Sequence, residues 1–247
     1  VLSGAPNPVR ATYQFPINTH GSIGPACAVA QLKDGQLTIW SPSQATHSLQ
    51  SELTTVVGMP KDKIRLVYLE GSGCYGRNGH EDCTADAALI ATLTGQPVRV
   101  QWMREGEHGW DPKSPPLVAD FAGAVNREGF ISAWHGEFFM PIHTGSLNDF
   151  PLLAAVASGV PRKGPYTGSI HQNAPPPYDI TNALVEVHRL KDTPLRPAHL
   201  RTPGRMQNTY ANECFMDELA AASKQDPLLF RMKHLSGERA MAVLNRV

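Results

Sequence analysis

The sequence has no excess of charge of either sign, because 22 Lys and Arg residues balance 22 Asp and Glu residues. This balance argues against a nucleic-acid-binding protein that relies on a broad positive field. No segment contains the run of about 20 apolar residues that a helix needs to cross a bilayer, so we expect no membrane span. What remains is the composition of an ordinary globular protein, with 41% hydrophobic and 18% charged residues.

Cysteine is also scarce, and its spacing matches none of the familiar zinc motifs. The four cysteines are Cys27, Cys74, Cys83 and Cys214, and they form no C-x-x-C pair. In a chain of 247 residues an even count does not require disulfides, so the redox compartment stays open. The chain has no initiator Met and no signal-peptide-like apolar stretch at its start. We interpret it as a processed chain or as part of a longer polypeptide.

The pattern of apolar residues predicts an α+β fold with mixed sheets and packed helices. Residues 28–40 are apolar on both sides of Asp34-Gly35, which is a strong β-hairpin signal. Helical spacing follows over residues 45–57, with Ser43 as a plausible N-cap and Gly58 as the stop. The next elements are expected to be a strand at 63–70, a helix at 81–94 and a strand at 97–105.

The second half of the chain is expected to contain fewer regular elements. Its strands and helices are expected within residues 117–141, 182–190, 209–225 and 227–237. Its first strand pair should turn at Arg127-Glu128-Gly129, and Asp226-Pro227 should begin the last helix. Loops are expected over the opening thirty residues, 106–116 and 143–182. We divide the chain into a first subdomain of residues 1–115 and a second of 116–247 that is truncated at its C-terminus.

The most informative stretch is a glycine-rich loop at residues 71–79, which reads GSGCYGRNG. Its first six residues spell the G-x-G-x-x-G dinucleotide fingerprint. However, Arg77-Asn78-Gly79 separates that motif from the helix, and Glu105 lies too far along the chain to contact a ribose. A second interpretation is a tight strand-to-helix turn that needs positive φ. A third is a loop whose backbone N–H groups approach an anionic or oxo ligand closely.

The motif HEDC at residues 80–83 suggests a metal site at first sight. Adjacent residues in a helix point in different directions, and paired zinc ligands normally lie two to four residues apart. We therefore interpret its acids as helix-start residues that the helix dipole favours, and we expect no protein metal ligand.

Together with its flanks, the glycine loop closely resembles the molybdopterin-binding large subunit of the xanthine oxidase superfamily. Within it, the resemblance is to the isoquinoline 1-oxidoreductase and nicotinate dehydrogenase β-subunit branch. The segments that carry it, in the family order, are THGSIGPACAVA (19–30), TIWSPSQATH (38–47), GSGCYGRNGHEDCTADAALIATLTGQPVRVQWMREGEHGWDP (71–112) and LRTPGRMQNTYANECFMDELAAASKQDPLLFRMKHL (200–235). The resemblance is weakest across 140–180. It implies an α+β molybdopterin-binding domain of the aldehyde oxidase and xanthine dehydrogenase type.

The resemblance also implies roles for particular residues. In that family a Gln after the hairpin strand hydrogen-bonds an oxo ligand of molybdenum, and the matching residue is Gln44. The resemblance implies cofactor-binding positions in two loops. In the glycine loop they are Gly73, Cys74, Tyr75 and Gly76, and in an Arg-x-x-Gly loop before the long helix they are Arg201, Thr202 and Gly204. Gln44 and Tyr75 would take part in catalysis, Tyr75 as an aromatic beside the substrate. Tyr75 could equally be a packed loop aromatic, and Cys74 has no His placed in sequence to activate it as a nucleophile.

The sequence departs from the better-known xanthine oxidase pattern in two respects. Cys74-Tyr75 and Gly79 replace the Gly-Phe-Gly and the acidic residue of that pattern, which argues against purine recognition. The superfamily also uses a late Gly-Glu motif as its general base. Gly237-Glu238 is the only late Gly-Glu here, and it matches a different segment. The base is therefore expected on another chain or in polypeptide that this sequence does not include.

By resemblance, the chain is a segment of a molybdenum-dependent oxidoreductase that hydroxylates an N-heterocycle or an aldehyde with water-derived oxygen. The implied cofactor is molybdopterin with molybdenum, in its cytosine dinucleotide form. Electrons would leave through [2Fe–2S] clusters on a ferredoxin-like small subunit, with no FAD on this chain. Further implied partners are the rest of the large subunit or a second molybdenum-binding chain, and a cytochrome c. The implied compartment is the bacterial periplasm or cytoplasm, with the periplasm favoured.

Two alternatives stay open at this stage. One is an NAD-binding dehydrogenase domain that uses GSGCYG for its dinucleotide. The other is a non-catalytic scaffold fragment that needs a second chain for activity.

Overall fold

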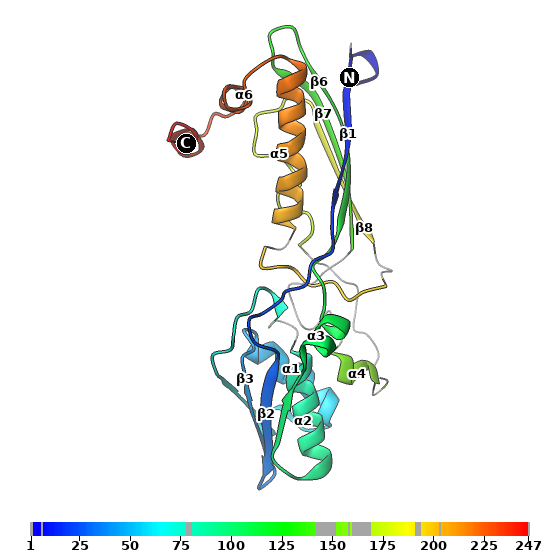
Figure 1. The fold of residues 1–247 in the computed structure, drawn as a ribbon, viewed down its shortest axis with the longest axis vertical. Coiled ribbons are helices and arrows are strands. Elements are labelled where there is room, and N and C mark those ends of the chain that lie inside the picture. The colour runs from blue at the N-terminus through cyan, green and yellow to red at the C-terminus, as the bar shows by residue number, and fades with distance from the viewer. Residues whose placement is uncertain are drawn as a thin grey trace.

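The computed structural model describes residues 2–5, 7–77, 81–141, 152–157, 159, 169–190, 194–202 and 204–246. Asn78 and Gly79 of the glycine loop and His80 of HEDC lie outside the described residues, as does much of the stretch 143–182. The described chain forms two lobes, each built on a four-stranded sheet, in an elongated molecule (Figure 1). The sheet orders are β4-β3-β2-β5 and β1-β6-β7-β8.

The first lobe carries the glycine loop. Its elements are β2 (Cys27–Lys33), β3 (Gln36–Ser41), α1 (Thr46–Val57), the 3-10 helix η2 (Lys61–Lys63), β4 (Ile64–Tyr68), α2 (Asp82–Thr94), β5 (Val98–Gln101), α3 (Arg104–Trp110) and α4 (Leu153–Ala157). The predicted hairpin is confirmed: β2 and β3 pair antiparallel around Asp34 and Gly35, whose φ values are 51° and 73°. The helix predictions are also confirmed, because α1 and α2 end at Gly58 and Gly95 in the left-handed conformation.

The core of the first lobe is built from small and aliphatic side chains. Alternate residues of β2 and β3, such as Ala30 and Leu37, are buried and lie in one cluster with Leu49 and Leu53 of α1. The buried face of α2 consists largely of alanine, in which Ala85, Ala87, Ala88 and Ala91 are fully buried. Because alanine is short, α2 can lie close to the sheet. The glycine loop connects the end of β4 to the start of α2, so this packing fixes the positions of both ends of the loop.

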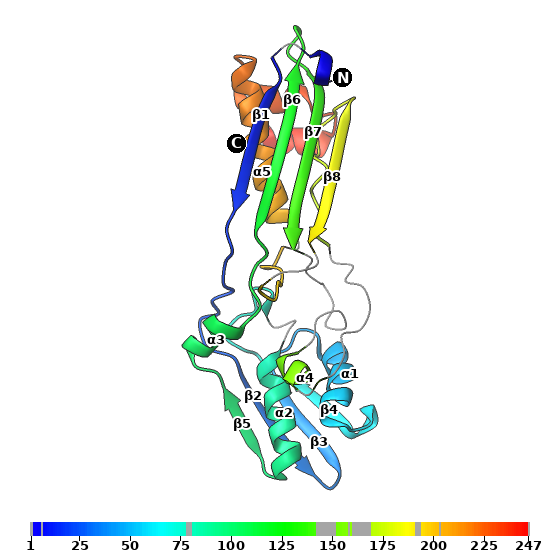
Figure 2. The same cartoon turned by 90° about the vertical axis from the view of Figure 1, so that its right-hand side faces the viewer.

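The second lobe has a longer sheet and an aromatic core. Its elements are the 3-10 helix η1 (Leu2–Gly4), β1 (Val9–Phe15), β6 (Leu117–Val125), β7 (Ile131–Pro141), β8 (Ala183–Leu190), α5 (Arg205–Ala222), α6 (Pro227–Lys233) and α7 (Glu238–Leu244). Helix α5 lies along one face of this sheet (Figures 1 and 2). Its Phe215 packs on Phe121 at 4.8 Å and on Trp134 at 5.0 Å between ring centroids. The contact requires a glycine in β6, since a Cβ on Gly123 would lie 2.9 Å from the Phe215 ring.

Three expectations about local structure are wrong. The opening residues were expected to form a loop, but β1 pairs antiparallel with β6 from Val9 opposite Gly123 to Phe15 opposite Leu117. The N-cap of α1 is Ala45 instead of Ser43, whose hydroxyl accepts a hydrogen bond from the Ala45 N–H at 3.1 Å. The first five residues of the stretch 106–116, which was expected to be a loop, lie within α3.

The two sheets are also interleaved along the chain. The division at residue 115 stays a proposal, and β1, from the first of the two proposed subdomains, pairs in the sheet of the second. The chain therefore crosses between the lobes before β2 and again after α3, as Figure 2 shows. Within the described ranges, no helix is both long enough and apolar enough to cross a membrane.

Candidate functional site

A cavity of about 450 Å³ lies where the glycine loop faces the segment that leads into α5. Its lining residues are Gln44, Gly73, Cys74, Tyr75, Gly76, His199 and Arg201. Six of the eight predicted site residues are therefore brought together from three distant segments of the sequence. The other two predicted residues are not among the lining residues: Thr202 directly follows Arg201, and Gly204 is the N-cap of α5.

The backbone of the glycine loop has a conformation that depends on its glycines. Gly73 and Gly76 have φ values of 118° and 103°, and Tyr75 between them has a φ of 50°. A Cβ on Gly76 would overlap the carbonyl oxygen of His199 and would lie 3.0 Å from the amide nitrogen of Arg201. No other residue type fits there, so the loop lies in direct backbone contact with residues 199–201.

Gln44 lies between β3 and α1, and the glycine loop holds its side-chain amide. The Cys74 thiol donates a hydrogen bond to Gln44 Oε1 at 2.9 Å. The thiol sulfur in turn accepts a hydrogen bond from the backbone N–H of Gly76 at 3.4 Å. The Nε2 group of Gln44 has no acceptor among the residues that the structure describes, so its two N–H groups are available to the cavity.

Tyr75 both packs on the loop and lines the cavity. A Cβ on Gly73 would lie 2.8 Å from Tyr75 Cε2 and 3.1 Å from its Cζ, so the ring covers the Gly73 backbone. The packing explains why Gly73 must lack a side chain. A role for Tyr75 beside a substrate stays a prediction.

The segment before α5 presents a helix N-terminus near the cavity. Arg201 has a φ of 62°, and the backbone N–H of Thr202 donates to the Leu200 carbonyl at 2.7 Å. Gly204 is required by its surroundings, because a Cβ there would lie 2.7 Å from the carbonyl oxygen of Ile170. The 18 residues of α5 leave unsatisfied N–H groups at this end, which favours an anionic group nearby.

Residues 1–235 match a protein family described as the molybdopterin cofactor-binding domain. The chain belongs to this family. It is 34% identical over 242 residues to a nicotinate dehydrogenase subunit of Pseudomonas putida, covering 97% of this chain and 20% of that protein. It is 26% identical over 248 residues to the isoquinoline 1-oxidoreductase β-subunit of Brevundimonas diminuta, covering 95% of this chain and 29% of that protein.

Solved structures share the fold of this molybdopterin cofactor-binding domain. Aldehyde oxidoreductase from Desulfovibrio gigas is similar with a TM-score of 0.79 at 21% identity, over 96% of this chain and 25% of that one. Quinoline 2-oxidoreductase from Pseudomonas putida 86 is similar with a TM-score of 0.79 at 15% identity, over 96% and 29%. The predicted family and the α+β fold with mixed sheets are thereby confirmed. The chain spans less than a third of the length of these four proteins.

The family match and the sheet topology argue against the dinucleotide alternative. A dinucleotide fold needs a parallel sheet behind its glycine motif. In this domain β4 is parallel to β3, whereas β2 is antiparallel to both β3 and β5. The literal G-x-G-x-x-G therefore lies in a different structural context.

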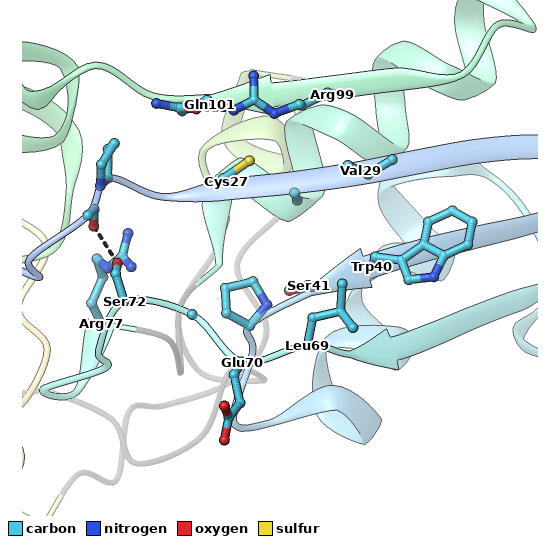
Figure 3. Close-up of a pocket in the computed structure, with 15 residues that line it drawn as sticks. Cys27, Val29, Trp40, Ser41, Leu69, Glu70, Ser72, Arg77, Arg99 and Gln101 are labelled. Atoms are coloured by element: carbon cyan, nitrogen blue, oxygen red, sulfur yellow. Dashed lines mark hydrogen bonds between the residues drawn. The ribbon is translucent and has the colours of Figure 1, made fainter.

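A buried ion-pair network holds the far end of the glycine loop. Arg77 pairs with Glu107 of α3 at 2.9 Å, and the two side chains are 4% and 2% exposed. The second carboxylate oxygen of Glu107 pairs with Arg104 at 2.6 Å. At the near end of the loop, Ser72 donates a hydrogen bond to the Gly24 carbonyl at 2.8 Å. Figure 3 shows Ser72 and Arg77 at one end of a second cavity, of about 350 Å³, beside β2, β3 and β5.

Carboxyl groups with perturbed protonation lie behind the loop. Burial raises the pKa of Glu81 to about 7, although the nearby Arg77 opposes the shift. Burial likewise raises the pKa of Asp111 to about 6. Glu81 is the N-cap residue of α2 and Asp82 its first residue, which confirms that the acids of HEDC mark a helix start. Asp82 pairs with Arg196 at 2.6 Å and accepts the N–H of Leu153 at 2.8 Å.

The domain contains two histidines near the cavity that the sequence interpretation missed. His199 lines the cavity, and its carbonyl oxygen contacts Gly76. The ring nitrogens of buried His20 lie 3.0 Å and 3.1 Å from the carbonyl oxygens of Pro112 and His199. Burial lowers the pKa of His20 to about 4, and the hydrogen bonds to the His199 and Pro112 carbonyl oxygens oppose this shift. His20 lies within THGSIGPACAVA, and nothing local in that segment indicates contacts to residues so far along the chain.

The side chains around the site do not form a cluster of metal ligands among the described residues. Within the described part of the chain, no group of three or more His, Cys, Asp or Glu side chains could hold a metal ion. The acids nearest the glycine loop are engaged in ion pairs or face Arg77. The described residues that line the cavity carry amide, thiol, phenol, imidazole and guanidinium groups.

Proposed function

We propose that this domain binds a molybdenum-bearing pterin cofactor in the cavity between the glycine loop and residues 199–204, as part of a larger molybdenum hydroxylase. The observation that carries the proposal is the convergence of Gln44, the glycine loop and Arg201 on one cavity, in a chain of the molybdopterin cofactor-binding family. The bound cofactor supplies two-electron redox chemistry, and the protein supplies orientation and electrostatics.

The residues of the cavity fit such a cofactor. A pterin that carries phosphate groups is anionic, and among the described residues that line the cavity none is Asp or Glu. Arg201 offers a cation, and the N-terminus of α5 offers unsatisfied N–H groups close by. Because Gly76 lacks a side chain, the glycine loop lies directly against the backbone of residues 199–201, and the two segments together line the cavity.

Each group has a distinct task in this proposal. Gln44 donates an N–H from Nε2 to the cofactor without bringing a charge into the site. Gly73 and Gly76 allow the positive-φ backbone that brings the loop to the wall of the cavity, and Tyr75 bounds the space in which a substrate ring would lie. Arg201, Thr202 and Gly204 position the phosphate-bearing part against the start of α5.

The finer parts of the proposal draw on the named relatives. The nicotinate dehydrogenase and isoquinoline 1-oxidoreductase relatives are named for N-heterocyclic substrates. We therefore favour hydroxylation of an N-heterocycle over that of an aldehyde. The cofactor would be the cytosine dinucleotide, and electrons would leave through a [2Fe–2S] subunit, with a cytochrome c as the next acceptor and the periplasm as the favoured compartment. The general base would come from the rest of the large subunit or from a second chain.

The decisive test is chemical analysis of the protein purified with its native partners. We expect molybdenum close to one atom per copy of this domain, and release of a pterin cytosine dinucleotide. Native mass spectrometry should detect a polypeptide or segment that supplies the missing Glu. Absence of molybdenum together with saturable micromolar binding of NADH would overturn the proposal in favour of a dinucleotide site.

A further inference from the structure

We propose that Cys74 is a positioning residue that fixes the orientation of the Gln44 amide, so that its N–H groups and not its carbonyl face the cavity. The proposal rests on the proposed function, in which Gln44 acts as a hydrogen-bond donor to the cofactor. It assigns to a cysteine a task that needs neither nucleophilic attack nor metal binding.

The contacts of the thiol determine where its single proton lies. Cys74 Sγ accepts the Gly76 N–H at 3.4 Å, so the thiol proton is free to point elsewhere. It points to Gln44 Oε1 at 2.9 Å. A carboxamide can rotate by half a turn and exchange its oxygen with its nitrogen. The rotated amide would place an NH₂ group where the thiol donates, and would lose the bond.

The position of the thiol is itself fixed by the turn in which Cys74 lies. The backbone N–H of Arg77 donates to the Cys74 carbonyl at 2.9 Å, which closes a four-residue turn. The turn includes Tyr75 and Gly76 with positive φ, and the Tyr75 ring packs over the backbone of Gly73. Arg77 is anchored in turn by the buried pair with Glu107. The ion pair to α3 thus fixes the position of Arg77, the turn fixes Cys74 relative to Arg77, and the thiol holds the amide of Gln44.

Gln44 has no other means of holding its amide within the described structure. Its side chain is exposed to the cavity, and Cys74 supplies its only side-chain hydrogen bond among the described residues. Ser41 and Ser43 fix the backbone on either side of Pro42 by bonds to the N–H groups of Ser43 and Ala45, both at 3.1 Å. The backbone before the helix is thus held independently of Cys74, and the thiol acts on the side chain of Gln44.

The test is a double-mutant cycle in the molybdenum-loaded enzyme, with Cys74→Ala, Gln44→Ala and the pair. Loss of a single hydrogen bond corresponds to a decrease in kcat of about five- to tenfold for Cys74→Ala, with KM and molybdenum content unchanged. In the Gln44→Ala background the same substitution should change kcat by less than about twofold, because Cys74 acts through Gln44. Cys74→Ser should restore most of the activity, and Cys214→Ser on α5 is the matched control, with unchanged kcat.

A second readout does not depend on catalysis. In protein labelled with ¹⁵N-glutamine, the two side-chain N–H signals of Gln44 are those that disappear in Gln44→Ala. We expect these signals to shift or broaden in Cys74→Ala and to return to their original positions in Cys74→Ser. Unchanged signals in Cys74→Ala, or an equal decrease in kcat with and without Gln44, would overturn the proposal. A protein without molybdenum would instead overturn the proposed function, while the amide signals would still decide whether the thiol orients Gln44.

Discussion

The second lobe and the glycine loop are held by opposite kinds of interaction. In the second lobe, Phe121 packs on Trp134, Phe138 and Phe215 with ring centroids 4.8–5.4 Å apart. The glycine loop has four glycines in nine residues and one aromatic ring, and the buried pair between Arg77 and Glu107 anchors it. One region is stabilised by apolar area, and the other is positioned by charge.

The two kinds of interaction have different consequences: one contributes mainly to stability, and the other mainly to the position of the backbone. Burial of aromatic rings contributes strongly to the free energy of folding, but it tolerates small shifts. A buried ion pair adds little net stability, because desolvation offsets the attraction, yet its hydrogen bonds define distance and direction closely. A loop whose shape depends on glycines with positive φ gains more from the second kind of contact.

The largest effect should come from the aromatic core. Phe215→Ala removes a fully buried ring, and we expect the free energy of unfolding to fall by about 3–5 kcal/mol. Denaturant unfolding measures this change. Phe130→Ala, at a ring that is 44% exposed and contacts Lys233, should change it by about 1 kcal/mol at most. Equal effects of the two substitutions would contradict the assignment of stability to the buried aromatic cluster.

Removing the charge of Glu107 should lower the free energy of unfolding, because Glu107 and Arg77 form a buried ion pair. Glu107→Gln keeps the shape of the side chain but leaves Arg77 and Arg104 without their counter-ion. We expect about 3 kcal/mol of destabilisation. We also expect the glycine loop to become more accessible to proteolysis and to hydrogen exchange than the second lobe. If the protection of both regions falls equally, the pair does not serve the loop in particular.

The same contrast explains what the sequence could and could not predict. Local signals indicated the hairpin at Asp34-Gly35, the ends of α1 and α2, and the N-cap of α6, where Asp226 accepts the N–H groups of Leu228 and Leu229. They did not indicate β1, because its partner β6 lies more than a hundred residues away and Pro residues flank both strands.

The candidate site divides in the same way. Matched motifs identified six residues that line the cavity, since each motif is local. His199 and His20 were not predicted, because their contacts at the site involve backbone carbonyl oxygens and residues far apart in the sequence. Helix α3 was missed for a related reason. Its sequence is polar, and the buried carboxylate of Glu107 is satisfied by distant partners, namely Arg77 and the backbone N–H of Ala26, as well as by Arg104 within the helix.

A smaller effect, with a defined pH dependence, is expected at Glu81. Its pKa is raised by burial from 4.5 to about 7, so the folded state binds the proton more tightly than the unfolded state. The contribution of this carboxyl to stability is therefore complete below pH 4.5 and is lost as pH rises through 7. Glu81→Gln stays neutral, so its stability relative to the unmodified chain should rise by about 2 kcal/mol between pH 5 and pH 8.

Denaturant titrations of both chains at the two pH values measure the difference at Glu81. Arg77, Asp82 and Asp111 surround this carboxyl, and Asp111 also has a raised pKa, so the unmodified chain alone cannot isolate one group. The comparison with Glu81→Gln removes the contribution of Asp111, which both chains share. A difference that is constant from pH 5 to pH 8 would contradict the assignment to Glu81.

The smallest effect should come from an ion pair on the open face of the second lobe. His135 on β7 and Glu186 on β8 approach to 2.8 Å, but their side chains are 29% and 45% exposed. Water solvates both groups when the contact is broken, so Glu186→Gln should change the free energy of unfolding by less than about 1 kcal/mol. The substitution is the exposed counterpart of Glu107→Gln, because both replace a carboxylate by an amide of the same shape. If Glu186→Gln lowered the free energy of unfolding more than Glu107→Gln, burial would not explain why one ion pair matters for the loop and the other contributes little to the sheet.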